Sequence, residues 1–577
     1  MTRNYDSFSM GLILCFEDAF PNEKMLAAEE YLAEISTEFL IKASSFLLTY
    51  NVNREKLEDP KSFLDIFFSE ENNAFKENIL QHMIEMRKRA RKPVGVFHEY
   101  SGLRVIEIAL GAVRIEGAYD NGKLERDLFK SLLVLNTEFS NRQMKAIETT
   151  NDIDQKIRIQ ILTFTAHYAV FDKSNYKLEK IWMAQVIKAF LFFEFLESYE
   201  NTKPLLNEFC KYYEVKDWRE YLESLLPITQ NVINRAVEGN TDLIVSKDDS
   251  YDKNVKFLEK LIVTPYDSTN ESDFLTLRSK PILKTSEGKY RIIFDIFATE
   301  LIFKGLYFKL REINDLLEKN RIPDLKGMYG LEFSEKILLY KSIESIYPKA
   351  IQYSGKQIDD MGINSAPDYY LRIGNKVLLF ESKDFLIRAD KKFSFDYNVY
   401  DEEFGKTLDF EEKANGSLKN GAVLQLIKNV TRVLRKDFPF DKGINQKEVK
   451  VYPILVLHDL QYEVLGFKDF VDQWYNQELL ILKEEGFNVN RIQPLTIVNI
   501  DSLLLYQKVL ETTKPLSDFI DDFHRFNMSK IHSEDDFYRK MRPFGYFLEE
   551  QIRIKGIGKK PDIFSKIVDQ ILTTSAS

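Results

Sequence analysis

Apolar residues return at helical spacing through most of the first 245 residues. Between residues 23 and 48, for example, apolar side chains recur every three or four positions with polar residues between them. The stretch 103–115 is compatible with either a helix or a strand. We therefore predict that residues 1–245 form a mainly helical region, with helices over residues 23–48, 63–91, 124–147, 157–199 and 218–236.

The pattern changes after two polar stretches, residues 246–251 and 264–272, which predict a linker over residues 246–274. Beyond it, short apolar runs bounded by turn residues alternate with stretches of helical spacing. This order predicts an α/β domain over residues 275–577, with a mixed central sheet flanked by helices. Besides one further hairpin described below, we expect strands over 281–284, 290–294, 451–457 and 494–500, helices over 298–317, 330–346, 421–434 and 502–526, and a polar loop over 391–419.

The composition is that of a globular protein, with 44% hydrophobic and 29% charged residues. A chain of 577 residues is too long for one ordinary domain, so two or three domains are expected. The formal net charge is −10, and any surface that binds nucleic acid must therefore be a local patch on an acidic protein.

The sequence indicates that this chain is neither a secreted nor a membrane protein. Cys15 and Cys210 are the two cysteines, so neither a disulfide framework nor a cysteine-based zinc site is expected. The most apolar stretch, residues 181–195, contains Lys188 and Glu194 and is too short to span a bilayer. The first residues lack the layout of a signal peptide. We expect a cytoplasmic protein without a membrane partner.

The most informative stretch is residues 366–386. Asp368 follows a proline and opens a predicted strand, and a Gly-Asn pair then predicts a tight turn. The apolar strand 377–380 comes next and leads directly into Glu381 and Lys383. Because alternate side chains share a face of a strand, these two should point the same way, and the turn should bring Asp368 beside them. Two carboxylates and a lysine at one sheet edge could bind a divalent metal ion and activate a water molecule.

The individual letters of this pattern are common in the chain. Only the stretch 367–383 has both parts at the distance of a hairpin, with an apolar strand between them. The alternative is a surface hairpin whose charged end is merely solvated. Glu-x-Lys recurs at residues 214–216, 287–289, 411–413 and 448–450, and Pro-Asp at 323–324 and 561–562.

With Pro367-Asp368 as one half and Glu381-Ser382-Lys383 as the other, the hairpin resembles the signature of the PD-(D/E)xK, or restriction-endonuclease-like, nuclease superfamily. The resemblance covers about residues 275–510. It implies Mg²⁺ (or Mn²⁺) bound by Asp368, Glu381 and the backbone carbonyl of Ser382. It also implies that Lys383 orients a metal-bound water or stabilises charge on the scissile phosphate.

Members of this superfamily carry a glutamate on the helix before the hairpin and often a polar residue on the helix after it. Glu335 is our candidate for the first position, with Glu332 as the alternative because the two lie three residues apart on one helix face. Gln425 is our candidate for the second position. The plain alternatives are first-turn acids that suit the helix dipole, and a surface glutamine.

Other charged and polar residues carry weaker signals. His458 follows the predicted strand 451–457, and we expect a structural role for it. The chain contains no phosphate-binding loop of the NTPase type. Three basic clusters could contact a DNA backbone, although each also fits a solvated helix end or loop: residues 87–93, then Arg388, Lys391 and Lys392, then Arg432, Arg435 and Lys436.

We therefore expect a metal-dependent deoxyribonuclease, and the resemblance implies bacterial defence against phage or other foreign DNA. A nuclease for DNA repair or recombination is one alternative. A non-enzymatic interaction protein with a degenerate nuclease-like domain is another. The helical region 1–245 would recognise a trigger, restrain the nuclease, or mediate homo-oligomerisation or contact with a protein partner.

Overall fold

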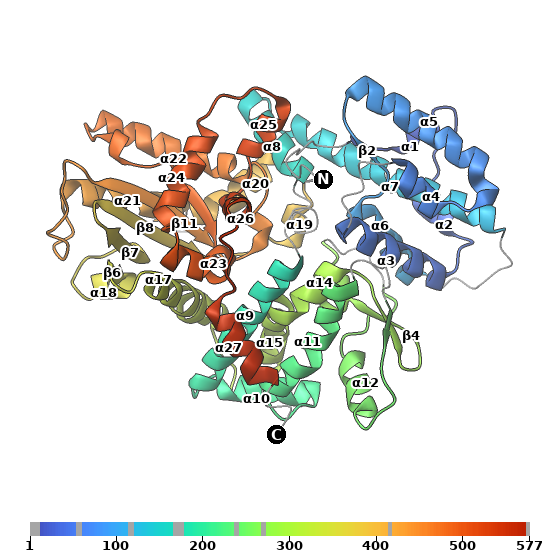
Figure 1. Ribbon diagram of the computed structural model, residues 1–577, viewed down its shortest axis with the longest axis horizontal. Coiled ribbons are helices and arrows are strands. Elements are labelled where there is room, and N and C mark those ends of the chain that lie inside the picture. The colour runs from blue at the N-terminus through green and yellow to red at the C-terminus, as the bar shows by residue number, and fades with distance from the viewer. Residues whose placement is uncertain are drawn as a thin grey trace. The chain divides into compact units, whose positions relative to one another are not determined.

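A five-stranded mixed sheet organises the C-terminal half of the chain (Figure 1). Its strand order is β12-β11-β8-β7-β6. β8 (Lys376–Lys383), β11 (Lys450–Leu457) and β12 (Thr496–Asn499) run parallel to one another. β7 (Tyr369–Ile373) pairs antiparallel with β8, and β6 (Ile351–Ser354) pairs antiparallel with β7. The structure thus confirms the prediction of an α/β fold with a mixed sheet.

Strands β8 and β11 are buried because each has a neighbouring strand on both sides and a helix packed against it. Their nearly continuous apolar sequences are typical of strands covered on both faces. In β8, residues Val377 to Phe380 are fully buried. Helices α21 (Ala422–Arg435) and η6 (Tyr329–Tyr340, a π-helix) pack against β8, and α21 also packs against β11. The site described below lies where these helices meet the end of β8.

This computed structural model describes residues 12–53, 60–112, 120–165, 178–235, 242–266, 273–412 and 418–572. Contacts between residues divide the chain into two compact units, each assembled from separate stretches. The first comprises residues 1–145, 173–185 and 205–313, and the second comprises 146–172, 186–204 and 314–577. The predicted limits 1–245, 246–274 and 275–577 do not follow these units.

The first unit contains mostly helices. A three-stranded sheet of order β3-β5-β4 and a parallel pair of short strands accompany them. Its elements are β1 (Leu12–Ile13), α1 (Phe16–Ala19), α2 (Ala28–Leu32), α3 (Thr37–Asn53), α4 (Pro60–Phe67), η2 (Glu70–Asn72), α5 (Asn73–Ala90), β2 (Val94–Gly95), α6 (Glu99–Gly111), α7 (Asn121–Ala146), α10 (Lys203–Tyr213), α11 (Trp218–Arg235), β3 (Asp242–Ile244), α12 (Tyr251–Glu259), α13 (Leu275–Ser279), β4 (Ile282–Ser286), β5 (Lys289–Ile292), α14 (Asp295–Glu300), η5 (Leu301–Gly305) and α15 (Leu306–Leu316).

The second unit surrounds the five-stranded sheet with helices. The boundary between the units falls within α9, at Gln185, and near the end of α15, at Ile313. Its further elements are η3 (Ile147–Thr149), α8 (Ile153–Thr165), α9 (Leu178–Ser198), α16 (Leu325–Met328), α17 (Lys341–Ile346), α18 (Gly355–Asp359), α19 (Ala389–Lys392), α20 (Tyr397–Leu408), β9 (Phe410–Glu412), β10 (Leu418–Asn420), η7 (Leu460–Tyr462), α22 (Phe467–Glu484), η8 (Val489–Arg491), α23 (Ile500–Thr512), α24 (Leu516–Asn527), α25 (Glu534–Lys540), α26 (Phe544–Ile554) and α27 (Asp562–Leu572).

The predicted polar loop over residues 391–419 is wrong. It contains the second half of α19, all of α20 and β9, and the start of β10, which pairs with β9, although residues 413–417 lie outside the described residues. Asp396 caps α20 by accepting a hydrogen bond from the Asn398 amide at 2.8 Å. Four buried residues return at helical spacing along that helix: Tyr397, Tyr400, Phe404 and Leu408. The abundance of charged residues between them concealed this amphipathic pattern.

Other predicted elements form with different limits. The ambiguous stretch 103–115 is helical over residues 103–111, within α6, and residues 113–115 lie outside the described residues. The predicted linker contains α12, which buries Phe257 and Leu258, while residues 267–272 lie outside the described residues. The predicted helix over 502–526 is interrupted before Pro515, which lacks an amide hydrogen to continue it. In the described part of the chain, no helix has the length and apolarity needed to cross a bilayer.

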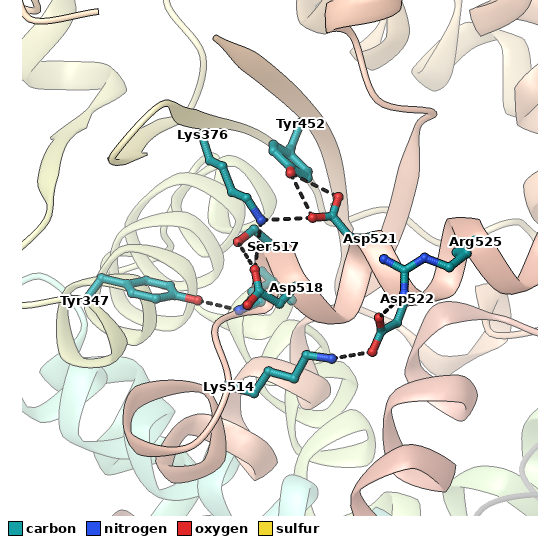
Figure 2. A network of polar contacts seen from close by, with 10 residues as sticks. Tyr347, Lys376, Tyr452, Lys514, Ser517, Asp518, Asp521, Asp522 and Arg525 are labelled. Carbon is teal, nitrogen blue, oxygen red and sulfur yellow. Dashed lines mark hydrogen bonds and ion pairs between the residues drawn. The ribbon is translucent and has the colours of Figure 1, made fainter. Parts of the chain in front are cut away.

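A polar network fastens α24 to the amino-terminal ends of β8 and β11 (Figure 2). The Lys376 ammonium lies 2.8 Å from Asp518 and 2.9 Å from Asp521. The Tyr452 hydroxyl donates to Asp521 at 3.0 Å, so one carboxylate joins two strands to the helix. At the start of α24, the Leu516 amide donates to the Tyr347 hydroxyl at 2.8 Å.

Candidate active site

The predicted hairpin forms from β7 and β8. Gly374 occupies the turn with φ of +59°, a conformation that glycine adopts without a steric penalty. Tyr369 pairs with Phe380, so the same antiparallel register places Asp368 opposite Glu381 at the end of the ladder. Asp368 is tied there because its Oδ2 accepts a hydrogen bond from the Ser382 amide at 2.6 Å.

Lys383 lies at the centre of the charged groups. Its Nζ is 2.6 Å from Glu381 Oε1 and 3.1 Å from Gln425 Oε1. Glu381 and Lys383 therefore share a face of β8, and Gln425 of α21 reaches that face from above the strand. Glu381 is only 2% exposed, so its carboxylate is shielded from bulk water and is paired with Lys383.

Glu335 reaches the same charges from η6. Its Oε1 accepts a hydrogen bond from the Tyr340 hydroxyl, five residues further along the chain. An α-helix puts residues five apart on different faces, whereas the wider winding of a π-helix brings them together. The alternative candidate, Glu332, pairs instead with Lys336 at 2.6 Å. The structure thus brings Glu335 rather than Glu332 to the hairpin.

Burial raises the pKa values of all three acidic side chains at the site, and nearby negative charge adds to the effect. Burial, and then the charge of Asp368, raises the pKa of Glu335 to about 7 and that of Glu381 to about 8. Burial also raises the pKa of Asp368. Burial lowers the pKa of Lys383, but the charges of Glu381 and Asp368 outweigh it and the net shift is upward. The site is therefore short of positive charge for its three carboxylates.

The donor set fits a divalent cation that prefers oxygen ligands. Glu381 Oε2 is buried and makes no hydrogen bond to any described residue, so it has a lone pair free for a ligand. Within the described residues, no three His, Cys, Asp or Glu side chains gather closely enough to form a metal site by themselves. The predicted set differs from such a site because it uses two carboxylates, Asp368 and Glu381, and the Ser382 carbonyl.

The opposite side of the β8 terminus is closed by a second group of polar side chains. The Ser382 hydroxyl lies 2.8 Å from His458 Nε2, and burial lowers the pKa of His458. Ser334 donates to Asp384 at 2.5 Å. His458 therefore joins the ends of β11 and β8, and its structural role stays a prediction.

Some contacts near the hairpin were not expected from the sequence. Gly355 donates its amide to the Asp368 carbonyl at 2.8 Å, and no motif marks it. Tyr340 had no signal either, because its position depends on the π-helical winding. In the predicted basic strip after the hairpin, Lys392 is buried, whereas the Arg388 side chain is 75% exposed and pairs with Asp390 at 3.0 Å.

Comparisons of this chain with protein-family models, curated proteins and solved structures found no match. The site offers buried carboxylate oxygens with a strong preference for a cation, and beside them an ammonium group held by two contacts. That combination suits the binding of a metal ion together with an anionic substrate such as a phosphate ester.

Proposed function

We propose that the chain is a metal-dependent nuclease of the PD-(D/E)xK type that hydrolyses phosphodiester bonds in DNA. The observation that supports this best is the convergence of Asp368, Glu381 and Lys383 at the end of one hairpin. Gln425 and Glu335, from the helices that follow and precede the hairpin, add to it.

In this proposal Asp368, Glu381 and the Ser382 carbonyl hold Mg²⁺ or Mn²⁺. The bound ion would supply positive charge to the phosphate and a more acidic water. Lys383, positioned by Gln425, stabilises negative charge on the phosphate or orients the water through its remaining hydrogen. Glu335, whose pKa burial raises to about 7, would exchange a proton near the reacting groups.

The decisive test compares DNA cleavage by the wild type and by Lys383→Ala in the presence of Mg²⁺ or Mn²⁺. We expect the variant to lose about two to three orders of magnitude in rate, because a charge-stabilising donor is removed. Lys289→Ala is a matched control, since Lys289 is exposed and belongs to another Glu-x-Lys triplet, on β5. Equal cleavage by Lys383→Ala and Lys289→Ala would reject the assignment.

The choice of substrates separates the remaining functions. Cleavage of plasmid and plain duplex favours defence against foreign DNA, whereas selective cleavage of forks and junctions favours repair or recombination. Parallel assays with RNA test the choice of DNA. A wild-type protein that binds no Mg²⁺ by calorimetry and cuts none of these substrates would favour a non-enzymatic interaction protein.

We also propose a setting for this activity. Bacterial defence in the cytoplasm is the role implied by the resemblance of the hairpin to restriction-type nucleases. The helical first part of the chain would then sense a trigger or mediate assembly with a second copy or a protein partner. Loss of protection against phage in cells that express Lys383→Ala, at unchanged protein level, is the expected result.

A further inference from the structure

Helix α21 presents three polar side chains toward the candidate site. Gln425, Asn429 and Arg432 follow one another at intervals of four and three residues, which places them on one face of the helix. Gln425 contacts Lys383, as described above. Asn429 is fully buried, which is unusual for an amide side chain unless its hydrogen bonds are satisfied.

Asn429 and Arg432 hold the loop that leads into Asp368. Arg432 donates from Nη1 to the Ser365 carbonyl at 2.8 Å and from Nη2 to the Asn364 carbonyl at 2.6 Å. Asn429 Nδ2 donates to the same Ser365 carbonyl at 3.3 Å. Its Oδ1 accepts from Arg432 Nη1 at 3.0 Å, so the two side chains also fix each other.

The loop requires such support. Ser365 has φ of +57°, a left-handed conformation that costs free energy for a residue with a side chain and persists only where the surroundings impose it. Asp368 lies three residues further on. The other end of this short segment is fixed by the hydrogen bonds of Asp368 to the Ser382 amide and of its carbonyl to Gly355.

One helix therefore contacts both halves of the motif. Through Gln425 it holds Lys383, and through Asn429 and Arg432 it holds the segment that carries Asp368. The two forked donors of an arginine match two neighbouring carbonyls, which a lysine ammonium on a flexible stem does not reproduce. The guanidinium of Arg432 is thus committed to backbone carbonyls, although the sequence placed it among candidate contacts to DNA phosphates.

We propose that Arg432 and Asn429 are positioning residues that set Asp368 at its distance from Glu381 and Lys383. The proposal rests on the proposed function insofar as the positioned carboxylate binds a metal ion. Whatever reaction the site carries out, Arg432 keeps the hydrogen bond between Asp368 and the Ser382 amide formed.

The first experiment measures hydrogen–deuterium exchange in peptides that cover residues 361–368 and 381–384. The variants are Arg432→Ala, Arg432→Lys and, as a control for loss of charge, Arg435→Ala, which removes an exposed arginine three residues further along α21. We expect faster exchange in both peptides for both Arg432 variants and wild-type exchange for Arg435→Ala. Unchanged exchange in Arg432→Ala, or rescue by Arg432→Lys, would overturn the proposal.

The second experiment measures Mg²⁺ affinity by calorimetry and cleavage kinetics on the same proteins. We expect affinity or kcat to fall by about 10- to 100-fold in the Arg432 variants, as for other residues that orient metal ligands. The KM for DNA and the salt dependence of DNA binding should not change, because no phosphate contact is lost. A reduced salt slope together with normal Mg²⁺ affinity would make Arg432 a phosphate contact and reject positioning.

The two experiments separate this inference from the proposed function. If the wild type neither binds Mg²⁺ nor cuts DNA, yet exchange rises in the Arg432 variants, the loop is positioned as inferred and the nuclease proposal falls. If the wild type cuts DNA and the Arg432 variants match it in exchange and Mg²⁺ affinity, the inference falls alone. Should Arg432→Ala fail to fold, Arg432→Lys, which keeps the charge but not the two forked donors to Ser365 and Asn364, provides the same comparison.

Discussion

At the scale of single residues, the candidate site depends on particular side chains and on the absence of a side chain at Gly355. Asp368 is held through its carboxylate by Ser382 and through its backbone by Gly355. The close approach of Gly355 to the chain beside Asp368 leaves no room for a larger residue. Lys383 depends in a similar way on Gln425, which gives its ammonium a second contact besides Glu381.

We predict that Gly355→Ala impairs the site more than the fold. A Cβ at this position would lie 2.9 Å from the Pro367 carbonyl oxygen, a backbone atom, so the segment with Asp368 must shift. DNA cleavage should fall by about 10-fold or more, as expected when a reacting group is slightly misplaced. Gly330→Ala is the control, because a Cβ there meets nothing within 4 Å. Equal activity of the two variants would contradict the prediction.

Because His524 is buried, we predict that the folded protein loses stability in mild acid. Burial, with a smaller contribution from Lys468, lowers the pKa of His524 to about 3, and its Nε2 lies 2.8 Å from the Thr496 hydroxyl. In the unfolded chain a histidine titrates near pH 6.5, so its contribution is fully present above that pH. The contribution is lost as the pH falls toward 3, because only the unfolded state then takes up the proton.

The matching measurement is chemical denaturation at pH 7.5 and pH 5. The wild type should lose about 2 kcal/mol more than His524→Gln over this interval, because the variant has no imidazole to protonate. His532→Gln, which changes an exposed histidine, should behave as the wild type. Parallel losses in all three proteins would show that other groups determine the acid sensitivity.

At the scale of elements, helix faces and strand alternation decide which residues meet. β8 presents Glu381 and Lys383 toward α21, while Lys376 at its other end is bound by α24. The same strand thus carries the candidate site at one end and the network of Figure 2 at the other. This network connects three elements through Asp521, which contacts Lys376 and Tyr452.

We predict that Asp521→Asn destabilises the protein by about 1–2 kcal/mol, because a charged acceptor shared by two donors is lost. Asp518 contacts Lys376 as well, but its side chain is 44% exposed against 23% for Asp521. Asp518→Asn should therefore cost under about 1 kcal/mol, as is usual for an exposed ion pair. Urea denaturation of the two variants measures the difference, and a larger loss for Asp518→Asn would refute this reasoning.

At the scale of the whole molecule, neither compact unit is one continuous stretch of the chain. The second unit takes in residues 186–204 as well as 314–577. Lys188 of α9 makes a buried ion pair with Asp501 of α23 at 2.8 Å. Phe192 contributes as well, because its ring contacts Phe333 at 4.7 Å between centroids. A fragment cut at the predicted linker would lose these contacts.

We predict that the fragment 275–577 does not unfold cooperatively. Without Lys188, Asp501 is left as a buried charge with no ion-pair partner, which typically costs about 3–5 kcal/mol. Lys188→Met in the full chain isolates this contribution and should lower the free energy of unfolding by a similar amount. Differential scanning calorimetry checks both, and a sharp transition of the isolated fragment would show that it folds by itself.

The sequence predicted the local features of the site well. The turn at Gly374, the alternation of Glu381 and Lys383, and the strand of β11 all follow from interactions between near neighbours in the chain. The loop predicted over residues 391–419 is wrong, because the buried residues of α20 recur at helical spacing among charged residues that hide the pattern. Whether the site cleaves DNA stays a prediction, since sequence pattern and geometry supply the groups and not the reaction.

The sequence by itself determined which residues share a strand or a helix face, because backbone sterics and periodicity act over a few residues. It thereby placed Asp368, Glu381 and Lys383 at one end of a hairpin. Only the tertiary structure decided that Arg432 supports the segment before Asp368 and that Lys188 pairs with Asp501. These partners lie far apart in the chain, and their meeting depends on how helices pack on the sheet.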